Sequence, residues 1–244
     1  MRCIVVIPTY NERSTIREVV EKVFHAVPEM HVLVVDDNSP DGTGAIADQL
    51  AQDHPARLFV LHRPSKEGLG RAYIAGFQRA LDDGYDIILQ MDADLSHDPA
   101  YIPAFLQKIQ DADLVLGSRY LRGISVVHWD LKRLILSKAA NRYVQLVAGI
   151  PITDATGGFK CWRSGALRAV GLESVRSVGY IFQVEMTYRA LKLGFRVEEV
   201  PIIFYERNLG RSKMSGRVVF EAVWGVWRLR FRRLGPAKGA RAGN

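Results

Sequence analysis

The sequence predicts an α/β fold in which a mostly parallel sheet is flanked by helices. Short apolar runs alternate with amphipathic segments of helical period along the first half of the chain, as repeated strand–helix–strand crossovers require. Runs such as Val32 to Val35 are apolar at every position, which is typical of strands that are buried on both faces. The chain has 244 residues, of which 48% are hydrophobic, and is long enough for one large domain.

The expected strands and helices follow one another in strict alternation. Each strand is a short apolar run that ends at turn-forming or polar residues. Each helix carries apolar residues three or four positions apart, which gives it one face to bury against the sheet. The strands are expected at residues 3–8, 31–36, 58–61, 86–91 and 113–117, and the helices at 15–26, 43–54, 70–82 and 99–111.

The second half of the chain is less regular. Residues 197–205 form another strand-like run, and Pro201 within it indicates an edge strand or a bulge, because proline cannot donate a ladder hydrogen bond. No internal repeat is present. We expect one folded body over residues 1–216, a basic amphipathic helix over 217–235 and a disordered tail over 236–244.

Composition narrows the classes of protein that fit. Cys3 and Cys161 are the only cysteines in the sequence, which indicates a reducing, cytoplasmic compartment and no disulfide framework. The first strand is expected at residue 3, which leaves no room for a cleavable signal, and no apolar run approaches the roughly 18 residues of a spanning helix. We therefore expect a soluble protein or one that is peripheral to a membrane.

The net charge of +7 is unevenly distributed. No acidic residue follows Glu221, whereas six basic residues do. Residues 1–221 are therefore close to neutral, and most of the positive net charge lies after them. The high pI therefore does not indicate a nucleic-acid-binding body. The six bases are Arg228, Arg230, Arg232, Arg233, Lys238 and Arg241.

Carboxylates gather where three of the expected strands end. Asp92 and Asp94 follow the fourth strand, and similar polar clusters follow the first strand at residues 9–12 and the second at 36–42. Ligands bind beyond the carboxyl ends of the strands in sheets of this kind. Two converging carboxylates suit Mg²⁺ or Mn²⁺, whose other ligands are water and substrate phosphates. The alternative is that Asp92 only caps the helix that follows.

The first strand lacks the Gly-x-Gly-x-x-Gly signature of a dinucleotide site, and Gly68-Leu69-Gly70 is interpreted as a turn and helix start.

Several motifs together resemble family 2 glycosyltransferases of the Rossmann-like glycosyltransferase A fold, and more narrowly the dolichyl- and polyprenyl-phosphate mannose synthases. The motifs that carry the resemblance span about residues 3–216 and are Pro8-Thr9-Tyr10-Asn11-Glu12, Asp36-Asp37-Asn38-Ser39-Pro40-Asp41-Gly42-Thr43, Met91-Asp92-Ala93-Asp94, Gly117-Ser118-Arg119-Tyr120, Trp129-Asp130-Leu131-Lys132-Arg133, Gly179-Tyr180-Ile181-Phe182-Gln183-Val184-Glu185 and the pair Arg207 and Lys213.

The resemblance implies metal-dependent, inverting transfer of mannose from GDP-mannose to a polyprenyl phosphate of the dolichyl or undecaprenyl type, catalysed by residues 1–216. It implies a catalytic set of Asp92, Asp94 and Arg119, and a metal site of Asp92, Asp94 and Ser96. It implies that the acceptor phosphate meets Arg119, Arg133 and Ser137. The donor would meet Pro8, Tyr10, Glu12, Val35, Asp37, Asp92, Ala93, Asp94, Arg207 and Lys213.

The expected chemistry needs no strong general base. A lipid phosphate has a second pKa near ~6, as phosphoserine has, and is largely dianionic at neutral pH. We expect Arg119 to bridge the two anionic substrates, so that Arg119→Ala lowers turnover with little loss of thermal stability. His97 and His128 are interpreted as orienting or solvated groups. Glu185 is either a base of raised pKa or the acceptor that holds a loop.

The C-terminal helix carries Trp224, Trp227 and Phe231 on one stripe, flanked by arginines. This pattern favours a helix lying on the cytoplasmic face of a membrane, although the stripe could instead pack on the body, and a membrane-embedded partner could supply the anchor. Two other functions fit parts of the sequence. One is a UDP-sugar-dependent lipid-phosphate glycosyltransferase, and the other is a non-enzymatic protein that binds an anionic surface or nucleic acid through its tail.

Overall fold

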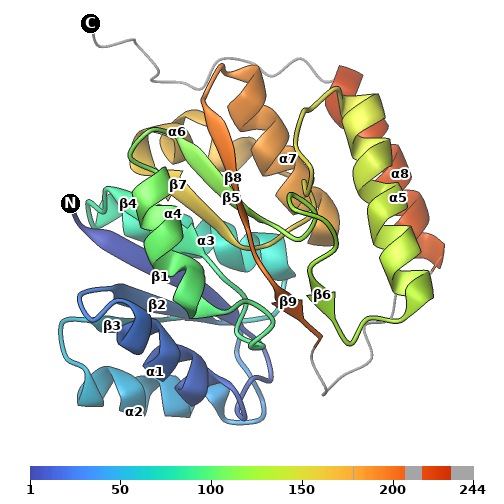
Figure 1. Ribbon diagram of the computed structural model, residues 1–244. Coiled ribbons are helices and arrows are strands. Elements are labelled where there is room, and N and C mark those ends of the chain that lie inside the picture. Colours follow the sequence, from blue (N-terminus) through green and yellow to red (C-terminus); the bar gives the residue numbers. More distant parts are fainter. Residues whose placement is uncertain (178, 207–215, 232–244) are drawn as a thin grey trace, which may run out of the picture.

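A mixed seven-stranded sheet organises the chain in the computed structural model, which describes residues 1–177, 179–206 and 216–231. The strand order is β3-β2-β1-β4-β7-β5-β8 (Figure 1). The first four strands are parallel, as predicted: β1 (Cys3–Thr9), β2 (His31–Asp36), β3 (Leu58–His62) and β4 (Ile87–Gln90).

The helices between these strands begin and end close to the predicted positions. They are α1 (Ile16–Ala26), α2 (Thr43–Asp53) and α3 (Leu69–Asp82). The helix predicted at 99–111 is divided into a 3-10 turn, η1 (Pro99–Tyr101), and a shorter helix, α4 (Ile102–Lys108). Asp98 accepts a hydrogen bond from the N–H of Ala100 at 2.9 Å and caps the turn.

One strand of the main sheet was not predicted from the sequence: β7 (Lys160–Arg163), which lies antiparallel between β4 and β5 (Leu114–Ser118). Four residues beginning with lysine do not present the apolar run by which the other strands were found. The run predicted at 197–205 is divided into β8 (Val197–Pro201) and β9 (Phe204–Tyr205). β8 is the edge strand, as Pro201 indicated, and β9 pairs with β6 (Val126–Val127) in a separate two-stranded ladder.

Each strand of the sheet contributes to two hydrophobic layers. Val5 and Ile7 pack with α1, α2 and α4 on one face, whereas Ile4 and Val6 pack with α3, α6 (Ser164–Ala169) and α7 (Gly179–Lys192) on the other. The alternation follows from the period of two in a strand. The ring of Phe182 on α7 stacks on Tyr73 of α3, with ring centroids 6.0 Å apart.

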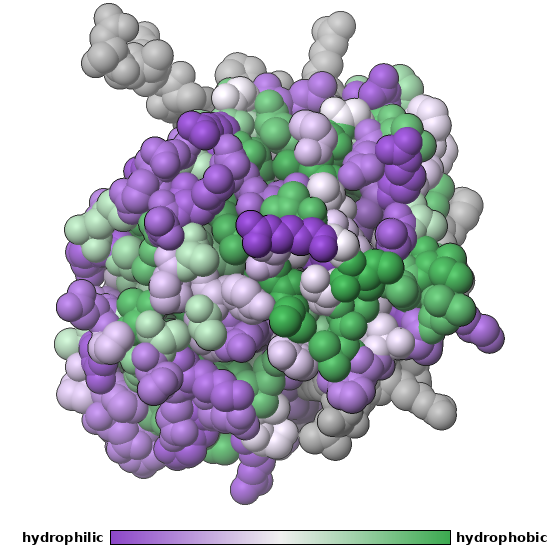
Figure 2. Space-filling model, in the orientation of Figure 1, coloured by the Kyte–Doolittle hydropathy of each residue, from purple (hydrophilic) through white to green (hydrophobic). Residues whose placement is uncertain are grey.

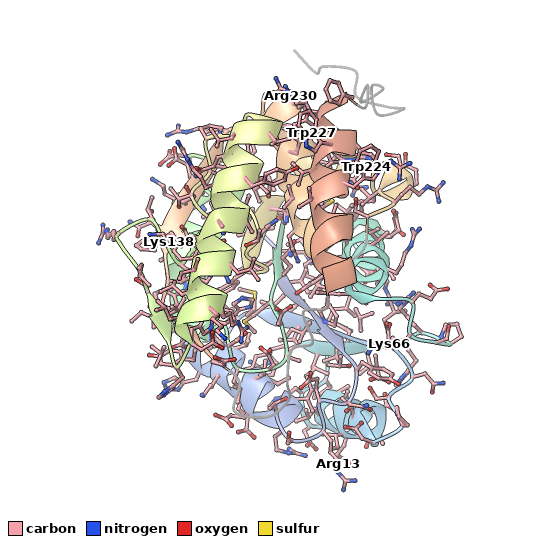
Figure 3. The ribbon with its side chains drawn as sticks, turned by 90° about the vertical axis from the view of Figure 1, so that its right-hand side faces the viewer. Arg13, Lys66, Lys138, Trp224, Trp227 and Arg230 are labelled. Carbon is pink, nitrogen blue, oxygen red and sulfur yellow. The ribbon has the colours of Figure 1, made fainter. Side chains whose placement is uncertain are left out.

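Two long helices, α5 (Leu131–Ala148) and α8 (Gly216–Phe231), lie side by side at one side of the molecule (Figures 1 and 3). The Tyr143 hydroxyl donates to the Val223 carbonyl at 3.0 Å, and Arg230 Nη1 donates to the Val147 carbonyl at 3.0 Å. α8 buries Val226 and Leu229 against the body. The tail predicted at 236–244 lies outside the described residues.

The first residue of β7, Lys160, is fully buried. Its Nζ donates to the Gln183 carbonyl at 2.7 Å and to the Thr187 Oγ1 at 2.9 Å, so that β7 is tied to α7. Burial disfavours the charged amine and lowers the pKa of Lys160 from 10.5 to about 7. Folding and protonation are therefore linked at this residue.

The linkage predicts how pH acts on stability. Between pH 7 and 10.5 the unfolded chain holds a proton on Lys160 that the folded chain has released, so raising the pH favours the folded state. The stability of the wild type relative to Lys160→Met should therefore increase from pH 7 toward pH 10, measured by urea unfolding. The matched control is Lys108→Met, at a lysine whose side chain is 42% exposed. A stability difference that stays constant over this range would contradict the assignment.

Candidate active site

The loops after β1 and β2 form the first part of the site. Pro8 and Val35, both predicted donor residues, are paired across β1 and β2. At the next pair, the buried Asp36 accepts hydrogen bonds from Thr9 Oγ1 at 3.0 Å and from Ser39 Oγ at 2.6 Å. Asp36 was not predicted as a site residue, and its role is to join the two strand ends.

Cross-loop hydrogen bonds hold the residues that follow Pro8. The N–H of Asn11 donates to Ser39 Oγ at 3.1 Å, and the N–H of Glu12 donates to Thr43 Oγ1 at 3.0 Å. Asn11 takes a φ of 62°, in the left-handed region that asparagine tolerates. Tyr10, between Asn11 and Thr9, lies under the ammonium of Lys66, 3.8 Å from its ring centroid.

Asp37, the last of the predicted donor residues on these loops, is almost fully buried and pairs with Arg63 Nη1 at 2.5 Å. Burial raises the pKa of Asp37, and the guanidinium of Arg63 opposes that shift. Pro8 and Val35 therefore lie at the ends of two paired strands, and Tyr10, Glu12 and Asp37 on the loops that follow, which are tied together as a single nucleoside site requires. Their contact with a nucleoside stays a prediction.

The chain turns directly after β4, at Asp92 and Asp94. Both are partly exposed, whereas Ala93 between them is buried, and Leu95 takes a φ of 62°. The Tyr73 hydroxyl donates to Asp92 Oδ1 at 2.9 Å. Burial raises the pKa of Tyr73, and the charges of both Asp92 and Asp94 raise it further. The charges of the two carboxylates thus both act on the Tyr73 hydroxyl, and neither side chain is buried in the hydrophobic core. That they share one metal ion stays a prediction.

This pair of carboxylates fits a divalent cation. Ser96 donates to Asp94 Oδ1 from its N–H at 3.1 Å and from its Oγ at 2.5 Å, which orients the carboxylate. Among the described residues, no group of three His, Cys, Asp or Glu side chains converges. Two hard oxygen ligands completed by water and phosphate are what Mg²⁺ and Mn²⁺ accept. The Ser96 hydroxyl lies against Asp94, and its role as a direct metal ligand stays a prediction.

His97 lies behind the carboxylates and is 3% exposed. Its Nδ1 accepts a hydrogen bond from the Asp92 N–H at 3.3 Å, and its ring packs on Phe159 and Phe204. Burial lowers the pKa of His97, although Asp92 and Asp94 oppose the shift. A neutral, packed imidazole that accepts from the backbone orients the loop, as the sequence indicated.

Arg119, the residue after β5, forms a buried ion pair that the sequence did not predict. Its Nε and Nη2 donate to the two carboxylate oxygens of Asp154 at 2.6 and 2.7 Å, and Nη2 also donates to Thr156 Oγ1 at 2.9 Å. Asp154 is fully buried, which disfavours ionisation, but Arg119 outweighs burial and the pKa of the carboxyl lies below its usual value. The pairing is bidentate, the strongest geometry for these groups.

The predicted acceptor residues lie next to this ion pair. The guanidinium of Arg133 lies over the Trp129 ring at 4.5 Å and pairs with Glu206. The same ring lies 5.3 Å from the guanidinium carbon of Arg119. Tyr120, the residue after Arg119, donates from its hydroxyl to Ser137 Oγ at 2.7 Å. The structure thus brings Arg119, Arg133 and Ser137 together, from β5 and α5.

Residues 4–171 of this chain match the family described as Glycosyl transferase family 2. The chain belongs to this family. It is 49% identical over 234 residues to the polyprenol monophosphomannose synthase of Mycolicibacterium smegmatis, covering 95% of this chain and 88% of that protein. It is also 49% identical over 228 residues to the undecaprenyl-phosphate mannosyltransferase of Micrococcus luteus, covering 93% of each.

This family 2 glycosyltransferase also has the predicted glycosyltransferase A fold. Glucosyl-3-phosphoglycerate synthase from Mycobacterium tuberculosis, solved with Mn²⁺, UDP and phosphoglyceric acid, superposes with a TM-score of 0.72 at 16% identity, covering 94% of this chain and 79% of that chain. At that identity the likeness shows the fold alone. The family match and the two relatives that are 49% identical show that the chain is an enzyme, as predicted, rather than only a protein that binds an anionic surface.

Some residues of the candidate site could not be assigned from the sequence, whereas the structure decides between the two roles that the sequence left open for Glu185. Asp154, Thr156 and Gly158 belong to a turn-rich segment whose partners are remote in the chain. Glu185 accepts hydrogen bonds from the N–H and Oγ of Ser177 at 3.3 and 2.5 Å and pairs with Arg189, so it holds a loop. Arg207 and Lys213 lie outside the described residues.

The buried ion pair changes the expectation that Arg119→Ala causes little loss of stability. Removing the guanidinium leaves the buried Asp154 carboxylate without its bidentate partner, so the variant should lose about 3–5 kcal/mol of unfolding free energy in urea titrations. Arg133→Ala is the matched control, because Arg133 and its partner Glu206 are each more than a quarter exposed, and it should lose about 1 kcal/mol or less. Equal losses of unfolding free energy in the two variants would show that the buried Asp154 carboxylate is not stabilised by Arg119.

Proposed function

We propose that this enzyme transfers mannose, with inversion, from GDP-mannose to a polyprenyl phosphate of the dolichyl or undecaprenyl type. The observation that carries the proposal is the juxtaposition of two anion-binding regions. The carboxylate turn at Asp92 and Asp94 suits a metal-bound diphosphate, and the arginines of β5 and α5 suit a second phosphate. The names of the two relatives that are 49% identical support the same substrates.

The nucleoside end of the donor would lie on the tied loops after β1 and β2. Carboxylates accept hydrogen bonds and do not donate when ionised, so Glu12 and Asp37 suit a base that presents N–H groups, as guanine does. Tyr10 supplies a ring for stacking, and Pro8 and Val35 supply apolar walls. Arg207 and Lys213 are proposed as further phosphate contacts.

Asp92 and Asp94 would hold Mg²⁺ or Mn²⁺ against the diphosphate, and the backbone of Ala93 would lie against the diphosphate between them. The bound cation supplies charge stabilisation as the nucleoside diphosphate leaves. The chain contributes the orientation of its ligands: Tyr73 holds Asp92 and Ser96 holds Asp94. Fixed dipoles and charges of this kind stabilise a developing negative charge without reorganising.

The acceptor phosphate would enter between Arg119, Arg133 and Ser137. As a dianion it attacks without a general base, in agreement with the structural position of Glu185, which holds the Ser177 loop. Asp154 fixes the guanidinium of Arg119, and Trp129 supports that of Arg133 from its ring face. Planar guanidinium groups of this kind match phosphate oxygens better than lysine does.

A hydrophobic surface surrounds the proposed acceptor entrance, and Figure 2 shows apolar residues gathered over β6 and the neighbouring part of α5. On α5, Leu131 and Ile135 are 69% and 59% exposed, and they flank Arg133 in the chain. Among the described residues, no helix is long and apolar enough to cross a membrane. The exposed apolar side chains of α5 suit a lipid acceptor that is met at a bilayer surface.

The α8 helix would extend this membrane surface. Trp224, Trp227 and Phe231 are 60%, 42% and 72% exposed, so a large part of the predicted stripe is open to solvent. Figure 3 labels the two tryptophans on α8. Aromatic rings beside arginines suit the headgroup level of a membrane. We propose peripheral attachment to the cytoplasmic face, with a membrane-embedded subunit as a further partner.

A transfer assay tests the proposal. With labelled GDP-mannose, Mg²⁺ and polyprenyl phosphate, label should move into the organic phase, and it should not do so when metal is omitted. Asp94→Ala should lower the rate about 100-fold or more, because a ligand of the charge-stabilising cation is lost. Asp98→Ala is the matched control, since Asp98 only caps the neighbouring 3-10 turn. Transfer from UDP-glucose but not from GDP-mannose would overturn the proposed donor.

Vesicle binding tests the membrane surface. Replacing Trp224 and Trp227 with serine should lower the partition coefficient onto anionic vesicles about tenfold or more, because two exposed rings no longer enter the interface. Cosedimentation measures the change. Leu193→Ser, at a leucine that is 40% exposed at the end of α7, should have little effect. Unchanged binding by the tryptophan variant would contradict the assignment.

A further inference from the structure

The side-chain amide of Gln183 lies at the start of α7 beside the carboxylate turn and is 3% exposed. Its Oε1 accepts a hydrogen bond from Gln90 Nε2 at 2.8 Å. Its Nε2 carries two N–H donors and has no hydrogen-bond partner among the described residues. A buried amide with unused donors is costly, which makes it a candidate for a ligand contact.

The orientation of the Gln183 amide follows from Trp162, which donates a hydrogen bond to Gln90, the partner of Gln183. The Trp162 Nε1, which can only donate, is 3.2 Å from Gln90 Oε1. Gln90 must therefore present its Nε2 to the other side, where it donates to the Gly158 carbonyl at 2.9 Å and to Gln183 Oε1. Gln183 in turn accepts through Oε1, so its Nε2 cannot be exchanged with the oxygen without placing two N–H groups against each other.

The direction of the unused donors is marked by Gly158. A Cβ placed on this glycine would lie 3.2 Å from Asp92 Oδ2 and 3.6 Å from Gln183 Nε2. Both polar atoms therefore lie close to the glycine, together with His97 Cε1 at 3.3 Å from the same Cβ position, so that a side chain here would be crowded against them. The Gln183 backbone is held as well, because Lys160 Nζ donates to its carbonyl at 2.7 Å.

We propose that Gln183 Nε2 donates a hydrogen bond to a hydroxyl oxygen of the sugar that is transferred, and so is a specificity-determining residue of the donor site. The inference rests on the proposed function, since it takes the diphosphate to lie at Asp92 and Asp94. A sugar joined to that diphosphate lies next to Asp92. Charged phosphate oxygens are matched by the cations of the site, whereas a neutral amide suits a neutral hydroxyl.

The test compares each nucleotide sugar with the nucleoside diphosphate that lacks the sugar. Dissociation constants are measured calorimetrically with Mn²⁺ for GDP-mannose, GDP, UDP-glucose and UDP. Gln183→Met removes both donors, and Gln183→Glu keeps the oxygen that Gln90 needs. Each variant should weaken binding of the nucleotide sugar about 5- to 10-fold, the value of one neutral hydrogen bond, and that of the diphosphate less than about twofold.

A second comparison keeps the inference testable even if the variants lose stability. Deoxy analogues of GDP-mannose, each lacking one hydroxyl, are titrated against the wild type. One analogue should bind about 5- to 10-fold more weakly than GDP-mannose to the wild type, but equally well to Gln183→Met, because the lost hydroxyl and the lost donor are the same contact. Thr187→Val, one turn further along α7 and also buried, is the matched control and should retain the wild-type pattern.

The outcomes separate this inference from the proposed function. Equal loss of sugar and diphosphate affinity, or no loss in either, would overturn the sugar contact while leaving GDP-mannose as the donor. Binding of UDP-glucose in place of GDP-mannose, with the same dependence on Gln183, would overturn the proposed donor and retain the contact. A wild type that binds no nucleotide sugar would overturn both.

Discussion

The antiparallel pairing of β7 with β4 and β5 brings the beginning of β7 to the sheet edge where its parallel neighbours end. The residues that precede β7, 154–159, therefore enter the same edge as Asp92 and Asp94. Asp154 meets Arg119 there, and Gly158 lies against Asp92. A parallel strand in this position would carry that segment to the opposite edge, and neither contact could form.

The strand β7 separates a region of the site that carries carboxylates from a region that carries arginines. On one side, β1, β2 and β4 present carboxylates that suit a cation and a nucleoside. On the other, β5 and α5 present Arg119 and Arg133, which suit a phosphate. Phe204 connects the two sides, because its ring packs on His97 behind the carboxylates and on Trp129 between the arginines. Two anionic substrates can then approach each other with cationic groups between them.

Most of the parallel half could be predicted from the sequence, since each of its strands is a continuous apolar run and local pattern is what such a prediction measures. The strand ends also located Asp92 and Asp94, because all parallel strands end at one edge. β7 could not be predicted, since its burial depends on Lys160 finding Gln183 and Thr187 on α7. The ion pair of Arg119 could not be predicted for the same reason, because Asp154 is its partner only through the topology.

The sequence by itself determined the α/β class, the positions of five strands along the chain and the residue types gathered at the strand ends. It also determined the aromatic stripe of the last helix, because hydrophobic period and turn chemistry are local properties of the chain. Only the tertiary structure decided which of those residues are partners. It placed Asp154 on Arg119, and it brought the amide of Gln183 and the carboxylate of Asp92 close to Gly158, because these contacts join segments that are remote in the chain and that only the folded sheet brings together. It also made Glu185 the acceptor that holds the Ser177 loop, a choice between two roles that the residue type left open.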